Sequence, residues 1–159
     1  MQRCWAIYLL FKPEHPSLLL GKATFDNADS GFGIRIVPFD HLDGNVQGYA
    51  TPQGDIAINP VAALPHKTLF HEVAHVLLKH AADVTVSRSV REVEAEGVAL
   101  VCCEALGLDG TAYARGYLQH WLATNELTDA TAQRIIATAH RIIAAGGQAN
   151  GPGHLLGPS

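Results

Sequence analysis

The sequence lacks any apolar run that approaches the roughly 20 residues needed to cross a bilayer. The apolar stretch at residues 4–11 is short. Lys12, Pro13 and Glu14 follow it, where a signal peptide would have a small-residue cleavage site. We therefore expect an ordinary first structural element here, with neither a signal peptide nor a membrane segment.

Cysteine is scarce as well. Cys4, Cys102 and Cys103 are an odd number with an adjacent pair, which suits neither a disulfide framework nor a CxxC metal motif. We expect Cys102 and Cys103 to pack as small apolar groups, and this cysteine usage indicates a reducing, cytoplasmic compartment.

Basic residues are too few and too scattered for a phosphate-binding surface. Eleven Lys and Arg stand against fifteen Asp and Glu, for a net charge of −4. Domains that bind nucleic acid by themselves usually carry a basic patch that neutralises phosphates. The composition therefore argues against nucleic acid as a partner of this chain.

The 159 residues, 48% of them apolar, are enough for one domain with a hydrophobic core. We expect that domain to span residues 1–146, and a Gly- and Pro-rich disordered tail at 147–159. Alternating and turn-forming residues predict strands at 33–38, 46–50 and 55–59, the last two forming a hairpin. Helical periodicity predicts helices at 66–80, 89–106, 111–124 and 128–145. For the last of these we expect Thr128 or Asp129 as N-cap and a core-facing apolar stripe of Ile135, Ile136, Ala139, Ile142 and Ile143. The expected fold class is α+β.

The most informative segment is TLFHEVAHVLLKH at residues 68–80, which contains an HExxH motif within a predicted helix. Residues i and i+4 of a helix lie about 40° apart and one turn along, so His71 and His75 can bind one metal ion. Glu72 is offset by about 100° from His71, so it can address a zinc-bound water as general base. Zn²⁺ suits this ligand type, although Mn²⁺ or Co²⁺ could occupy the same site.

A catalytic zinc needs a third protein ligand and an open position. The candidates are the glutamates of the segment EVEAE at residues 92–96. Glu94 shares the apolar face of its predicted helix with Val98 and Cys102, whereas Glu92 and Glu96 share another face. A buried carboxylate is what a metal ligand requires, which favours Glu94 and leaves Glu92 and Glu96 as alternatives.

His80 is a weaker candidate for that ligand. It lies nine residues after His71, about 180° round a helix that no residue between His75 and His80 is expected to break. We expect it to act as a C-terminal cap of the helix.

The segments GYATPQGDIAINP, TLFHEVAHVLLKH and REVEAEGVALVCCEALGLD resemble the ImmA/IrrE-like metallopeptidases, most closely the C-terminal zincin domain of ArdC-type antirestriction proteins. The resemblance runs from about Gly33 to Gly146. It implies a gluzincin-like fold in which a small, mostly antiparallel sheet packs on the HExxH helix and a helical half follows. It also implies His71, His75 and Glu94 as metal ligands and Glu72 as the base.

ArdC-type proteins carry an N-terminal single-stranded-DNA-binding domain, for which this chain is too short. Their DNA binding therefore does not carry over. The expected function is that of a zinc metallopeptidase, a hydrolase whose partner is a protein or peptide substrate. The alternative is a zinc-binding regulatory or interaction module of a mobile-element or antirestriction protein, with little or no peptidase turnover.

Two further expectations concern substrate. A tyrosine or histidine opposite the base could donate a hydrogen bond to the oxyanion of the transition state. The candidates are Tyr49, Tyr113, Tyr117 and His120. The predicted hairpin could also offer an edge strand to an extended peptide.

Overall fold

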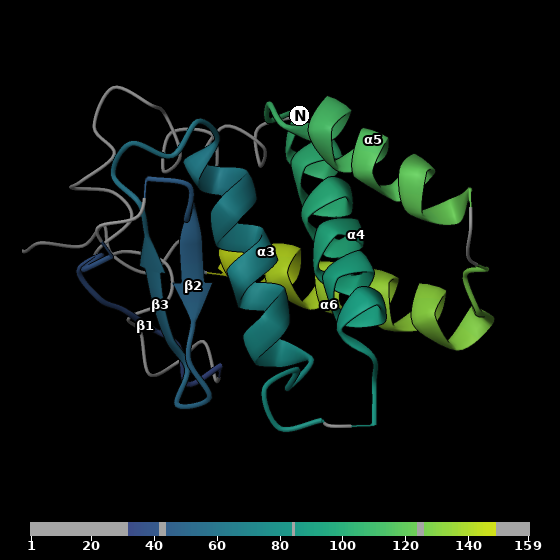
Figure 1. Cartoon of the computed structure of the whole chain (residues 1–159), viewed down its shortest axis with the longest axis horizontal. Helices are drawn as coiled ribbons and strands as arrows, with labels where there is room; N and C mark the ends of the chain where they lie inside the picture. Colours follow the sequence, from purple (N-terminus) through teal and green to yellow (C-terminus); the bar gives the residue numbers. More distant parts are fainter. Residues whose placement is uncertain (1–31, 42–43, 84, 124–125, 149–159) are drawn as a thin grey trace, which may run out of the picture.

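The computed structural model describes residues 32–41, 44–83, 85–123 and 126–148. Within them the chain is mixed α+β, with a small sheet at one side and the helices beside it (Figure 1). The element order is β1 (Arg35–Ile36), β2 (Gly48–Ala50), β3 (Asp55–Ile58), α3 (Pro65–Leu77), α4 (Arg88–Leu106), α5 (Thr111–Leu122) and α6 (Asp129–Gln148). Cys4 and most of the predicted tail lie outside the described residues, while α6 continues two residues beyond the expected end of the domain.

The sheet has the strand order β1-β3-β2. The predicted hairpin is confirmed, since β2 and β3 pair antiparallel with Tyr49 opposite Ala57. Its turn needs glycine at position 54, where φ is +88° and a Cβ would collide with the carbonyl of Gly33. β1 pairs with β3 in parallel, so the sheet is mixed rather than mostly antiparallel.

Helix α3 packs on β2 and β3 and lies between the sheet and α4 (Figure 1). Strand β2 can lie close to α3 because residue 48 is glycine. A Cβ on Gly48 would lie 2.7 Å from the Cγ2 atom of Thr68 on α3. The absence of a side chain therefore brings the edge strand directly against the HExxH helix.

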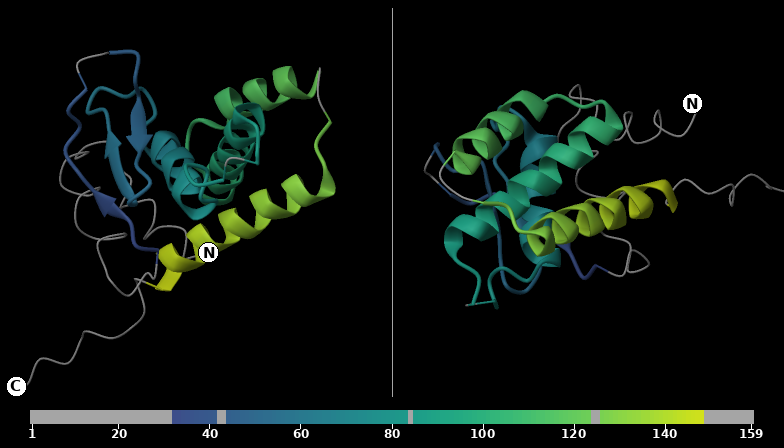
Figure 2. Two further views of the ribbon diagram at one scale, coloured as in Figure 1. Left: turned by 60° about the horizontal axis from the view of Figure 1, so that its bottom comes forward. Right: turned by 90° about the vertical axis from the view of Figure 1, so that its right-hand side faces the viewer.

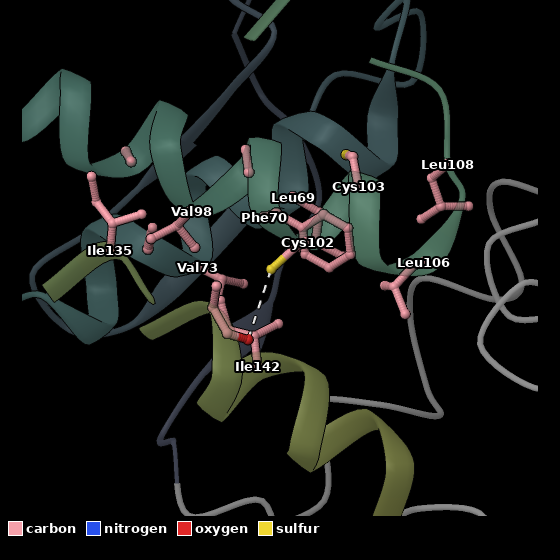
Figure 3. Close-up of a cluster of buried hydrophobic side chains, with 14 of the residues drawn as sticks. Leu69, Phe70, Val73, Val98, Cys102, Cys103, Leu106, Leu108, Ile135 and Ile142 are labelled. Atoms are coloured by element: carbon pink, nitrogen blue, oxygen red, sulfur yellow. Dashed lines mark hydrogen bonds between the residues drawn. The ribbon is translucent and has the colours of Figure 1, made fainter. Parts of the chain in front are cut away.

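Helix α4 is the centre of the helical half and packs against α3, α5 and α6. The hydroxyl of Ser87 caps its N-terminus by accepting from the Val90 N–H, and Gly107 ends it in the left-handed conformation. Figure 2 shows α6 crossing the layer formed by α3 and α4. The core between these three helices (Figure 3) is built from Leu69, Phe70, Val73, Val98, Cys102, Cys103, Ile135, Ala139 and Ile142.

Two expectations for α6 have different outcomes. The N–H of Thr131 donates to the hydroxyl of Thr128, which confirms Thr128 as the N-cap. The predicted apolar stripe is correct for Ile135 and Ile142, which are buried, but wrong for Ile136, which is 57% exposed.

The end of α3 also differs from the prediction. The helix stops at Leu77, and Lys79 adopts a left-handed φ of +56° although it is not glycine. The N–H of His80 then donates to the carbonyl of His75, a helix-closing bond of the Schellman type. This turn directs His80 back toward His75, so the expectation of an unbroken helix to residue 80 is wrong. No described helix is both long and apolar enough to span a membrane.

Candidate metal centre

Three potential ligand atoms converge where α3 faces α4. They are Nε2 of His71, Nε2 of His75 and Oε2 of Glu92, and all lie within 4.8 Å of one another. The two nitrogens are 3.1 Å apart, and the Glu92 oxygen is 3.4 Å from His71 and 3.8 Å from His75. The HExxH spacing supplies the two imidazoles from successive turns of α3, as predicted. This group could hold a metal ion.

The separations match the size of a tetrahedral N,N,O site. Zinc bonds of about 2.0–2.1 Å to nitrogen and oxygen place neighbouring ligand atoms roughly 3.3 Å apart in a tetrahedron. The three observed distances, 3.1, 3.4 and 3.8 Å, bracket that value. Two neutral imidazoles and one carboxylate are also a donor set that occurs in catalytic zinc sites.

The structure does not bring Glu94 to these histidines. Its carboxylate is buried, as expected, but Oε2 lies 2.9 Å from Nε2 of His80 and Oε1 lies 2.9 Å from Nε of Arg134. Glu92, which the apolar-face argument leaves as an alternative, lies with the two histidines instead. The structure therefore groups Glu92, rather than Glu94, with His71 and His75.

The reason is that α4 is buried on two faces. One face meets α6 and carries Val98 and Cys102 with Glu94; the other meets α3. Our inference equated the apolar face with the face toward the metal, whereas the HExxH helix packs against the side that carries Glu92 and Glu96. Burial alone does not distinguish these two faces.

Glu96 contacts Nδ1 of His71, the ring nitrogen that does not face Glu92. Its Oε2 accepts a hydrogen bond from Nδ1 of His71 at 3.1 Å, and the ammonium of Lys67 lies 2.7 Å from its Oε1. Burial by itself would lower the pKa of His71, but the Glu92 and Glu96 carboxylates outweigh it and raise this pKa to about 9. The same negative field that favours the imidazolium would favour a metal dication in its place.

The second histidine is contacted by His80 instead. Nδ1 of His80 lies 2.8 Å from Nδ1 of His75, and both rings are largely removed from solvent. Burial, reinforced for His75 by the charge on His71 and for His80 by Arg134 and Arg91, lowers both pKa values to about 4. His75 and His80 are therefore neutral near pH 7. The expectation of His80 as the C-terminal cap is therefore not met: Leu78 is the C-cap, and the ring of His80 is buried against His75.

Glu72 lies beside the group without belonging to it. Its side chain is buried and lines the same cleft as His71, His75 and Glu92. Burial raises the pKa of Glu72 to about 6, although the neighbouring His71 opposes the increase. A carboxylate whose pKa is close to neutral can both accept and release a proton, which is what a general base needs.

The cleft itself has a volume of about 450 Å³. One side is the edge strand β2 with Tyr49, and the other includes Arg88 and Arg91 at the start of α4. Sequence reasoning missed both arginines because nothing in the helical pattern showed which face of α4 the cleft would expose. Tyr49 alone among the four expected oxyanion donors lines the cleft, and its hydroxyl already donates to Asp40 at 2.8 Å.

Comparisons of this chain with protein-family models, with curated proteins and with solved structures give no match.

Proposed function

We propose that this protein is a zinc metallopeptidase with a gluzincin-like arrangement, related to the ImmA/IrrE-like enzymes that the sequence resembles. The observation that carries the proposal is the convergence of His71, His75 and Glu92 on one point at the wall of a cleft that Glu72 also lines. A purely structural site would have no use for Glu72, whereas hydrolysis requires a base there.

Zinc bound by His71, His75 and Glu92 would supply Lewis acidity at this site. Glu72 takes one proton from the attacking water onto its carboxylate. It then transfers that proton to the leaving nitrogen, so one water is consumed, the C–N bond breaks and the carboxylate is regenerated. Glu96 keeps the Nδ1 proton on His71 and so leaves its Nε2 lone pair for the metal.

The edge strand supports a peptide as substrate. β2 pairs with β3 on one side and, among the described residues, with no strand on the other. Its residues Gly48–Ala50 line the cleft next to the ligand group. An extended peptide can add to such an edge through main-chain hydrogen bonds, which would present its backbone to Glu72 and the metal.

The test combines metal content with hydrolysis. Elemental analysis should give about one zinc per chain for the wild type and for Glu72→Gln, because Glu72 is not a ligand. With labelled casein and a peptide mixture read by mass spectrometry, the wild type should cleave and Glu72→Gln should not. Removing a general base typically costs about 10²–10⁴-fold in rate.

Each possible failure of this test has its own meaning. A wild type without metal after purification free of chelators would refute the zinc site. A wild type that holds zinc but cleaves neither substrate would favour the zinc-binding regulatory module over the enzyme. Cleavage by Glu72→Gln at the wild-type rate would refute the role of Glu72.

A further inference from the structure

A buried chain of side chains leads away from the second histidine of the metal centre. His80 lies 2.8 Å from His75 through the two Nδ1 atoms, and its Nε2 lies 2.9 Å from Oε2 of Glu94. The other oxygen of Glu94 is 2.9 Å from Nε of Arg134. The side chains of His80 and Glu94 are only 3% and 2% exposed, so water does not replace these contacts.

In each hydrogen bond of this series of side chains, only one of the two atoms carries the hydrogen. The carboxylate of Glu94 accepts, so Nε2 of His80 carries the hydrogen. The Nδ1···Nδ1 contact of 2.8 Å holds one proton; when His75 binds a metal through Nε2 that proton is on His75, so Nδ1 of His80 accepts. His75 in this tautomer has a lone pair on Nε2, the atom that faces His71 and Glu92.

We propose that His80 is a positioning residue that, anchored by Glu94, fixes the ring orientation and tautomer of His75 so that its Nε2 atom is available to the metal. This inference rests on the proposed metal site. The two ligand histidines are then oriented in different ways. Glu96 contacts His71 directly, whereas Glu94 acts on His75 through the ring of His80, which lies between them.

The backbone holds His80 in place without help from its ring. Its N–H donates to the carbonyl of His75 at 3.0 Å, and Nη1 of Arg91 donates to its carbonyl oxygen at 2.7 Å. Lys79 supplies the left-handed turn that aims the side chain inward. Substitutions of the ring alone therefore leave the main-chain path intact, which makes them suitable tests.

Three substitutions separate positioning from a merely structural role. His80→Asn keeps an acceptor near the position of Nδ1 and loses the contact with Glu94. His80→Gln reaches Glu94 with its amide N–H but offers His75 no acceptor at the position of Nδ1. His80→Leu keeps neither contact.

The readout is the zinc affinity of the full chain, measured by competition with a chromophoric chelator, together with urea unfolding of the metal-free protein. Loss of an outer partner of a metal-ligating histidine typically lowers affinity about 10- to 100-fold. We expect that loss for His80→Leu and His80→Gln, and a smaller one for His80→Asn. Affinities that instead follow stability, with Gln equal to the wild type or Asn as weak as Leu, would overturn the proposal.

A second measurement needs no variant. Long-range ¹H–¹⁵N correlation spectra report which imidazole nitrogen carries the proton. The zinc-loaded wild type should show His75 protonated at Nδ1 and His80 protonated at Nε2. Coordination of His75 through Nδ1, or a proton on Nδ1 of His80, would refute the inference. A wild type without zinc refutes the proposed function itself, whereas normal zinc binding by all three variants refutes only the role of His80.

Discussion

The same substitution at two positions of α4 should have opposite effects, because Glu92 and Glu94 face different neighbours. Glu92→Gln should lose zinc and keep its fold, while Glu94→Gln should keep zinc and lose stability. The two residues are two positions apart on one helix, and each variant removes one carboxylate charge. Each variant is therefore the control for the other.

The expected change in the free energy of unfolding follows, for each variant, from the exposure of the glutamate side chain and from the groups it contacts. Glu92 is 35% exposed, and its carboxylate lies 3.4 and 3.8 Å from the two histidines. Its loss should change the free energy of unfolding by less than about 1 kcal/mol. Glu94 is 2% exposed and pairs with Arg134. Breaking a buried ion pair costs about 3–5 kcal/mol. We expect about 2–3 kcal/mol, because Arg134 is 37% exposed and glutamine can still accept from His80.

Urea unfolding in the presence of a chelator measures the stability of both variants without metal. With a slope of about 1–3 kcal/mol per molar urea, Glu94→Gln should lower the midpoint by about 1 M or more. Elemental analysis after dialysis against a slight excess of zinc gives the stoichiometry. The reasoning fails if Glu94→Gln has no zinc and Glu92→Gln retains it, since Glu94 would then be the ligand and α4 would be rotated from the position described.

Two other predictions test local features. Lys79→Gly should preserve or increase stability, because glycine adopts a positive φ without the roughly 1–2 kcal/mol penalty of other residues, whereas the β-branched Lys79→Val should unfold at lower urea. Cys102 and Cys103 are fully buried, and burial raises the pKa of each thiol to about 12. In a Cys4→Ser background neither should react with iodoacetamide at pH 9, the ordinary thiol pKa, until urea unfolds the chain. Rapid labelling of the native protein would contradict that burial.

Local patterns in the sequence predict the order and type of the described helices and of the β2–β3 hairpin. Among the described residues, the hairpin of β2 and β3, helices α3 to α6 and the cap at Thr128 follow from turn residues, periodicity and capping chemistry, which act over a few residues. Local patterns do not predict where α3 ends. Its left-handed turn lies at Lys79, a residue with no intrinsic preference for that conformation, so the surrounding packing and the bonds of His80 must hold it there.

The sequence by itself determined that His71 and His75 lie one helical turn apart with Glu72 between them, because HExxH on a helix permits no other arrangement. It also limited the third corner of the group to a short acidic segment. Only the tertiary structure shows that Glu92 lies with the two histidines and that Glu94 contacts His80. Which glutamate faces which neighbour depends on how α4 is rotated between α3 and α6. Helical periodicity defines the faces of a helix, but which face meets which neighbour is decided by long-range packing.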